Sequence, residues 1–483
     1  MKKGLHILIF AAVCICMAAG IHIAQEFRFY NIESNDLFLY DWADIASKLA
    51  RTGGLATLLA SFLTQFMRIP FAGTFILTGI YILSAWLLYR ILRRRTEAKY
   101  IAGLCLLPAA FLFLCMENDY YRFQGHASFI MMLACFYAYV SIAKKPVRYI
   151  IGALMIPVLF HAAGSVAVVF AVTALLWEVL GDGLKGLATL IFPAVMGLTA
   201  VIYVRFSLVS GWEHALTPFM YYEWPSTYFF PAYAWAMVPA VVLAAWIIGR
   251  MDVKPAYAKA ILALGLVISF FIAGNLYGKV HSRSYYRLIQ EQYWTETGDW
   301  DRIIKTADRR QPTYLVSYLN LALAQKGILV KNFMYYNPQD LSRIMYPTPN
   351  LKTGLTLQSA VYSAWDYHAA ARQAAFDANT VTSGNANPRQ LMVLIKTNAA
   401  LGAYDVAEKY ISILEKTLFY RGMAAELRAG LEKEFHAPQL PDMHIRYEGL
   451  EGDMRDILEA DPSQRIVSQF HQVYKIIEKE DGR

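Results

Sequence analysis

Apolar segments about as long as a membrane crossing fill the first 278 residues, and they constrain the fold more than any other feature. A helix needs about 20 apolar residues to cross the hydrocarbon core of a bilayer. The segments are Leu5–Ile23, Phe71–Tyr89, Ile101–Met116, Ala127–Ala143, Tyr149–Leu180, Leu187–Leu208, Ala232–Ile248 and Ala258–Gly278. Only 17% of the 483 residues are charged, against about 25% in a typical soluble domain. The sequence therefore predicts a polytopic helical membrane protein.

Charge divides the chain after the last apolar segment. Residues 1–278 carry 20 Lys and Arg against 13 Asp and Glu, whereas residues 279–483 carry 25 against 24. The basic excess lies among the apolar segments, where it usually records membrane orientation and does not indicate a nucleic-acid partner. We expect a transmembrane domain over residues 1–278 and a soluble domain over residues 279–483.

The long segment Tyr149–Leu180 decides the number of spans, since it is either one tilted helix or a hairpin of two short ones. With the N-terminus in the cytoplasm, the hairpin leaves 14 of the 20 basic residues inside and none in the outside loop Ser210–Pro231. A single helix would reverse the side of the membrane assigned to every later loop, which places the uncharged loop inside and Arg250, Lys254 and Lys259 outside. The positive-inside rule therefore favours the hairpin. The prediction is about nine spans in a bacterial inner membrane, with the C-terminal domain in the periplasm.

The first apolar segment and the loop after it, residues 24–69, shape the outer face. Leu5–Ile23 is longer than the 7–15 residues of a usual signal-peptide core, so a retained anchor is favoured over a cleaved signal. Within the loop, Ile45–Phe66 has apolar residues at helical spacing and is interrupted at Gly53-Gly54. This pattern predicts one or two amphipathic helices along the membrane surface.

Helix pairs joined by tight turns predict an all-α C-terminal domain. The pairs are Tyr285–Thr297 with Trp300–Asp308, Leu357–Trp365 with Tyr367–Ala378, and Arg389–Ala400 with Ala403–Lys416. They resemble tetratricopeptide repeats, whose helix pairs stack into a solenoid. The spacing between units is irregular, so a bundle of helical hairpins is the alternative. Leu329–Asn350, rich in aromatic residues and proline, is expected to be an irregular insertion.

Ionisable residues of the predicted outside loops supply the candidate site. They are Asp36 and Asp41 in the first loop, Glu117, Asp119 and Arg122 in the second, and His161 at the hairpin tip. A carboxylate beside an apolar surface can act as a general base or hold a divalent cation, the one candidate cofactor. Arg122 and His161 are candidates for binding a lipid phosphate. The alternatives are solvated acids, a helix cap at Asp41 and a packing histidine at His161.

The order of parts resembles the GT-C class of membrane glycosyltransferases, in which a first span precedes a long outside loop with acids and surface helices. The resemblance implies a polyprenyl-phosphate-linked sugar donor at the periplasmic face. It makes Asp36 the first candidate base or metal ligand and Asp41 the second, with Glu117 and Asp119 as second-loop acids. The adjacent acidic pair common in that class is absent from the first loop, which leaves metal dependence open.

Further motifs are similar to those of an uncharacterised family of bacterial multi-pass membrane proteins. They are Gly53-Gly54, Ser61-Phe-Leu-Thr-Gln65-Phe66, Pro70-Phe-Ala-Gly73, Gly298-Asp-Trp300 and Leu321-Ala-Leu-Ala-Gln-Lys-Gly327. The resemblance spans nearly the whole chain and implies an architecture without an activity.

Two functions follow as hypotheses. One is a transferase moving a sugar from a lipid carrier; the other is a non-catalytic scaffold that recruits a periplasmic protein through the repeat-like domain. A transporter is disfavoured because charges are scarce within the predicted spans.

Overall fold

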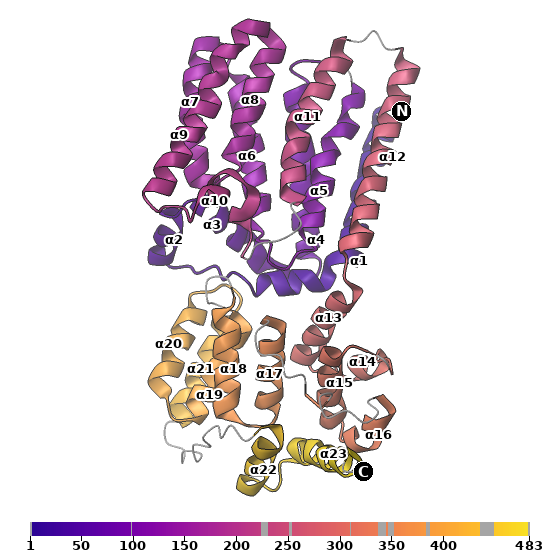
Figure 1. The fold of residues 1–483 in the computed structure, drawn as a ribbon, viewed down its shortest axis with the longest axis vertical. Helices are drawn as coiled ribbons and strands as arrows, with labels where there is room; N and C mark the ends of the chain where they lie inside the picture. The colour runs from indigo at the N-terminus through magenta and orange to yellow at the C-terminus, as the bar shows by residue number, and fades with distance from the viewer. Residues whose placement is uncertain are drawn as a thin grey trace. The chain divides into compact units, whose positions relative to one another are not determined.

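The computed structural model describes residues 2–97, 99–223, 230–250, 254–309, 311–336, 344–345, 352–382, 387–434 and 449–481. Throughout these residues the regular elements are helices, and β-type pairing is limited to an isolated bridge between Tyr121 and Tyr222. The predicted all-α class is therefore confirmed (Figure 1). The chain forms two compact units. Unit 1 comprises Met1–Phe29 and Asp41–His281, and unit 2 comprises Tyr30–Tyr40 and Ser282–Arg483.

Unit 1 is a bundle of helices built around α6. Its elements are α1 (Lys2–Glu33, whose last turn belongs to unit 2), α2 (Trp42–Leu49), α3 (Gly54–Thr64), η1 (Gln65–Arg68), α4 (Ala72–Leu92), η2 (Lys99–Leu106), α5 (Leu107–Cys115), α6 (Gln124–Ser141), α7 (Lys145–Ala163), α8 (Ala167–Asp182), η3 (Gly183–Leu190), α9 (Ile191–Arg205), α10 (Trp212–Leu216), η4 (Pro218–Tyr221), α11 (Phe230–Arg250) and α12 (Pro255–Val280). Helix α6 packs against α3, α4, α7 and α8. Its side chains Phe129, Met132 and Phe136 are fully buried there.

Five helices in the described chain are long and apolar enough to cross a membrane. They are Ala11–Glu33, Ala72–Leu92, Lys145–Ala163, Ala167–Arg205 and Phe230–Arg250. The fourth runs for 39 residues through α8, η3 and α9, and Ile101–Cys115 is a shorter apolar helix. Helix α6, which covers most of a predicted span, begins with the polar Gln124 and His126. By length and composition, the described chain thus has five candidate membrane spans, whereas the sequence pattern predicted about nine spans.

The long apolar segment folds as a hairpin. Helices α7 and α8 are joined by a short link containing Gly164, whose φ is +86°. At the open end, Lys145 Nζ lies 2.7 Å from Asp182 Oδ1, and Arg148 Nη2 lies 2.7 Å from Glu178 Oε2. These pairs join the start of α7 to the end of α8, so the two helices are antiparallel, as the charge pattern predicted.

The loops that were expected to share one side of a membrane meet at one end of unit 1. The backbone N–H of Gly53 donates to the carbonyl of His161 (2.7 Å), and Gln124 Nε2 donates to the carbonyl of Gly53 (3.0 Å). The Tyr221 hydroxyl donates to the carbonyl of Ala163 (2.7 Å). Hydrogen bonds therefore connect the first loop, the second loop, the hairpin tip and the loop before α11 into one loop end.

Unit 2 is a series of short helices. They are α13 (Arg283–Thr297), α14 (Trp300–Lys305), α15 (Thr313–Gln325), α16 (Leu329–Tyr336), α17 (Lys352–Ala364), α18 (His368–Thr380), α19 (Pro388–Ala400), α20 (Tyr404–Glu415), α21 (Arg421–Glu434), α22 (Leu450–Ala460) and α23 (Arg465–Asp481). Consecutive helices from α17 to α21 pack against one another. The predicted helix pairs are present as α13–α14, α17–α18 and α19–α20, while their relation to tetratricopeptide repeats stays a prediction.

Two expectations for the chain's organisation differ from the structure. Helix α1 continues past the predicted span to Glu33, and Tyr30–Tyr40, hereafter the inserted segment, belongs to unit 2. The units otherwise divide at His281/Ser282, three residues beyond the predicted boundary.

The segment Leu329–Asn350 was predicted to be irregular. It begins with α16, because Leu329 and Phe333 recur at helical spacing and are buried. Apart from Ile344 and Met345, the rest of that prediction lies outside the described residues.

We expect Gly164→Ala to destabilise unit 1 by about 1–3 kcal/mol, because a φ of +86° and ψ of −152° strain any side-chain-bearing residue. The added Cβ would also clash with Sδ of Met220. Gly197→Ala in α9 is the matched control, since its Cβ would meet nothing within 4 Å. Thermal unfolding of the detergent-solubilised protein measures both, and equal melting temperatures for the two variants would contradict the prediction.

Candidate functional site

A buried cluster of charged side chains surrounds Glu117 at the loop end of unit 1. Gln25 and Arg28 lie about one turn apart on α1 and reach the carboxylate together: Gln25 Nε2 donates to Oε1 (2.5 Å) and Arg28 Nη2 donates to Oε2 (3.1 Å). His281, which follows α12, places Nδ1 2.8 Å from the same Oε2. Arg28 Nη1 also donates to Asp119 Oδ1 (3.0 Å). The cluster therefore ties α1, the second loop and the end of α12.

The geometry of this cluster favours a structural role for Glu117. Its side chain is only 1% exposed, and both carboxylate oxygens already have donors. Burying a carboxylate is costly unless ion pairs and hydrogen bonds replace its hydration, which Arg28 and Gln25 do here. Asp119 is the more accessible carboxylate, since its side chain is 28% exposed beside the same guanidinium.

Arg122 and His161, the predicted phosphate-binding pair, lie at the loop end with separate partners. Arg122 is exposed and places Nε 4.0 Å from Glu223 Oε1. His161 is also exposed, and its Nδ1 lies 3.2 Å from the Tyr203 hydroxyl. In the described structure their contacts are distinct from those of the Glu117 cluster.

Asp36 and Asp41 fall in different units. Asp36 is half-buried in the inserted segment of unit 2, and Asp41 is half-buried before α2 in unit 1. Asp41 occupies the N-cap position, although its side chain makes no capping hydrogen bond. Of the six predicted residues, the structure brings Glu117 and Asp119 together and assigns Asp36 to a different unit from the rest. Among the described residues, no group of three or more His, Cys, Asp or Glu side chains could hold a metal ion.

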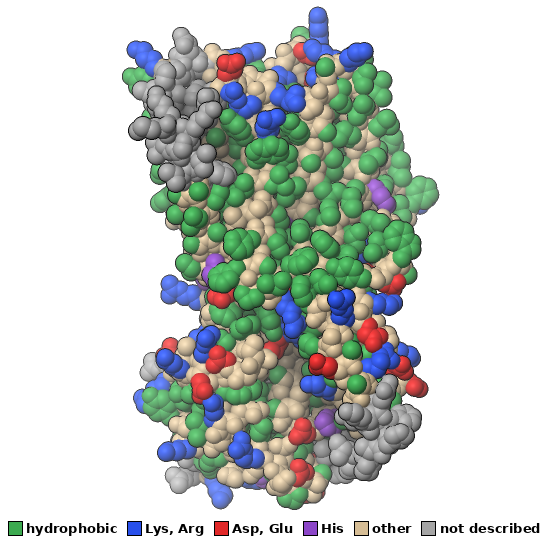
Figure 2. Space-filling model, turned by 180° about the vertical axis from the view of Figure 1, so that it is seen from behind, with side chains coloured by type: hydrophobic (Ala, Val, Ile, Leu, Met, Phe, Trp, Pro, Cys, Tyr) green, Lys and Arg blue, Asp and Glu red, His purple; other side chains and the backbone are tan. Residues whose placement is uncertain are grey.

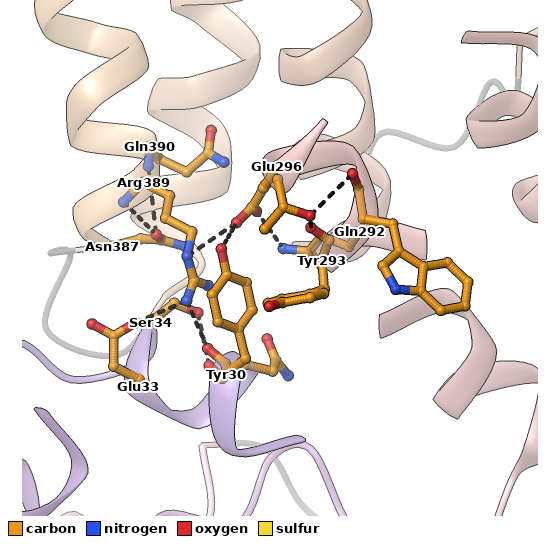
Figure 3. A network of polar contacts seen from close by, with 12 residues as sticks. Tyr30, Glu33, Ser34, Gln292, Tyr293, Glu296, Asn387, Arg389 and Gln390 are labelled. Atoms are coloured by element: carbon orange, nitrogen blue, oxygen red, sulfur yellow. Dashed lines mark hydrogen bonds and ion pairs between the residues drawn. The ribbon is translucent and has the colours of Figure 1, made fainter. Parts of the chain in front are cut away.

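A second buried network, centred on Arg389 at the start of α19, holds the inserted segment within unit 2 (Figure 3). Arg389 Nη2 donates to Glu33 Oε2 (2.8 Å) and to the carbonyl of Tyr30 (2.9 Å), and its Nε lies 3.0 Å from Glu296 Oε2. The Tyr420 hydroxyl donates to Glu33 Oε1 (2.7 Å), and the Tyr30 hydroxyl donates to Glu296 Oε2 (2.6 Å). One guanidinium thus joins α1, α13 and α19.

The inserted segment also contributes to the apolar core of unit 2. Leu37 is buried in a cluster with Leu391, Leu394, Ile411 and Leu414 of α19 and α20. Apolar contact of this kind stabilises by roughly 25 cal/mol per Å² removed from water. The segment is therefore an integral part of unit 2 and not a surface loop.

Sequence reasoning missed the two arginines that organise these networks. Arg28 carried a readable signal, since it lies beyond an apolar segment and one turn after Gln25 on the same helix face. Arg389 carried none, because it looks like an ordinary residue of an amphipathic helix and its partner Glu33 is 356 residues away.

The fold and the two networks define an all-helical protein with apolar helices long enough to cross a membrane. The chain belongs to a family described as "Family of unknown function (DUF6057)", whose model matches residues 2–480. Neither the curated proteins nor the solved structures contain a match to it.

We expect Arg389→Met to destabilise unit 2 by about 3–5 kcal/mol, because it leaves the Glu33 carboxylate buried without its guanidinium. Arg428→Met is the matched control: Arg428 also pairs with two glutamates, Glu408 and Glu415, but at the surface. Its loss should cost less than about 1 kcal/mol. Thermal unfolding of the purified full chain compares them, and similar losses in both variants would show that burial does not amplify the Arg389 pairing.

A buried carboxylate makes the stability of unit 2 depend on pH. Burial raises the pKa of Glu291, on α13, to about 7, although the Arg287 guanidinium at 2.9 Å pulls it back. The unfolded chain releases this proton near the ordinary pKa of about 4.3. The folded state therefore binds the proton more tightly, so stability falls as pH rises from about 5 to about 7.

Glu291→Gln should remove this dependence. We expect the melting temperature of the variant minus that of the wild type to rise between about pH 5 and pH 8, corresponding to at most about 3 kcal/mol. Taking the difference cancels every other titrating group shared by the two proteins. A difference that stays constant over this pH range would contradict the prediction.

Proposed function

We propose that this protein is a membrane-anchored scaffold in which unit 1 is the anchor and unit 2 recruits a protein partner. The observation that carries the proposal is the incorporation of Tyr30–Tyr40 into unit 2. That segment continues directly from the apolar helix α1, and Ser282 continues from α12. The chain of unit 2 therefore continues from apolar helices at two separate places, as expected of a domain whose role is to stay at the membrane.

The membrane arrangement proposed from charge remains part of this model. We infer nine spans in a bacterial inner membrane, a cytoplasmic N-terminus and unit 2 in the periplasm. The meeting of the predicted outside loops at one end of unit 1 supports this arrangement. Stacked helix pairs, as in α17–α21, present extended surfaces that suit protein recognition.

A lipid-linked-sugar-dependent glycosyltransferase is the second candidate, and the Glu117 cluster favours it. Two carboxylates, an arginine and a histidine converge at the loop end, where a polyprenyl-phosphate donor would present its phosphate. Under this hypothesis Asp119 becomes the better candidate base, since Glu117 is enclosed by donors. The scaffold is preferred because Arg122 and His161 have other partners.

Site-specific photocrosslinking in intact cells tests the scaffold. A crosslinkable residue at Phe376 of α18 or Val406 of α20, both exposed, should give a discrete protein adduct. The matched controls are Val158 of α7 and Leu198 of α9, exposed apolar side chains on predicted spans that should meet lipid. Adducts at all four positions, or at none, would count against partner recruitment by unit 2.

The same cells also test the glycosyltransferase hypothesis. Asp36→Asn and Asp119→Asn should leave the cell-envelope glycans unchanged if the protein is a scaffold. Loss of a glycan with unchanged protein abundance in either variant would instead support catalysis.

A further inference from the structure

Two arginines stand out at the end of unit 1 where the hairpin is open: Arg90 in the last turn of α4 and Arg94 in the turn that follows this helix. They are four residues apart in the sequence, and both are exposed. Both side chains contact Tyr137 of α6. Arg90 Nη2 donates to the tyrosine hydroxyl (3.4 Å), and Arg94 Cζ lies 5.4 Å from the centroid of the ring. Arg94 Nη2 also donates to Ser141 Oγ (2.8 Å). Within the described chain, these guanidinium contacts are all with uncharged groups.

Two neighbouring basic residues at this end instead form ion pairs with carboxylates. Arg148 pairs with Glu178 and Lys145 with Asp182, each at 2.7 Å. Like charges repel, so two exposed arginines that converge on one tyrosine favour an anion between them. Figure 2 shows that Lys and Arg side chains gather at this end of unit 1, the top of the view.

An exposed apolar stripe leads along α4 to the two arginines. Phe75, Leu83 and Trp86 are all exposed at helical spacing, and Arg90 Cζ lies 5.7 Å from the centroid of the Trp86 ring. At 1.5 Å per residue, Phe75 to Trp86 spans about 16 Å. That is close to half of a hydrocarbon core of about 30 Å, the depth of one leaflet. Tryptophan and tyrosine suit the headgroup boundary.

We propose that Arg90, Arg94, Tyr137 and Ser141 form a binding site for the phosphate of an anionic phospholipid, with an acyl chain along Phe75, Leu83 and Trp86. The guanidinium forks match phosphate oxygens, and the Tyr137 hydroxyl, which accepts from Arg90, supplies a further donor. Ser141 donates its own proton to the carbonyl of Tyr137 (2.6 Å) and serves to position Arg94. Basic sites between membrane helices commonly hold such headgroups. The site rests on the membrane location of unit 1 in the proposed function and not on partner recruitment.

Native mass spectrometry of the delipidated full chain tests the site by titration with dioleoyl phosphatidylglycerol and, separately, dioleoyl phosphatidylcholine. The wild type should bind phosphatidylglycerol more tightly, and R90Q/R94Q should weaken that binding by about ten-fold or more. K144Q/K185Q is the matched control, because it removes the same charge from exposed positions of neighbouring segments. It should bind like the wild type.

Several outcomes would overturn the proposal. Equal weakening in both double variants would indicate general attraction of the basic end, and unchanged binding in R90Q/R94Q would remove the site. Displacement of the lipid by millimolar inorganic phosphate would identify a free-phosphate site instead.

R90K/R94K keeps the two charges but loses the planar guanidinium groups, so it should bind phosphatidylglycerol with an intermediate affinity. This variant replaces R90Q/R94Q if R90Q/R94Q does not fold. Purified protein contains no partner, so this result is independent of the crosslinking result.

Discussion

The contact between Arg389 and Glu33 is the interaction on which unit 2 most depends. A guanidinium and a carboxylate, both almost fully buried, face each other across 356 residues of chain. Leaving either alone in an apolar interior would cost several kcal/mol, so the pair specifies where the inserted segment must lie. Leu37 then fills the core between α19 and α20. Unit 2 is consequently built from two separate stretches of the chain, Tyr30–Tyr40 and Ser282–Arg483, and residues 282–483 by themselves are an incomplete domain.

The same rule organises unit 1. Charges are scarce in this chain, and two buried carboxylates each pair with an arginine: Arg28 joins α1 to Glu117 in the second loop, and Arg148 joins α7 to Glu178 of α8. These pairs close the loop end and the open end of the hairpin. Arg90 and Arg94 differ from these paired arginines, because their described contacts are with neutral groups. In a chain that pairs its buried charges internally, exposed arginines above an apolar stripe point to a ligand from outside.

How far the sequence could predict this structure depended on the range of each interaction. The hairpin followed from counting charges on each side of a membrane, and its helices were visible as apolar runs. The α19–α20 pair followed from helical spacing around a turn glycine. Glu117 and Asp119 were found because acids next to apolar segments are conspicuous. The spacing of Gln25 and Arg28 marks a polar helix face but does not name its partner. Arg28 and His281 were therefore not connected with these acids, since nothing local links residues about 90 to 160 positions apart.

Local composition therefore determined the helical class, the apolar helices and the turns between the predicted helix pairs, because these depend on periodicity and on solvent preference within about 20 residues. Only the tertiary structure decided which acids are enclosed by donors, which arginines are left exposed, and that a turn of the first helix belongs to the second unit. Each of those outcomes depends on which distant side chains share a buried volume. Charge pairing and packing settle that choice together, and neither can be read from one segment of the chain.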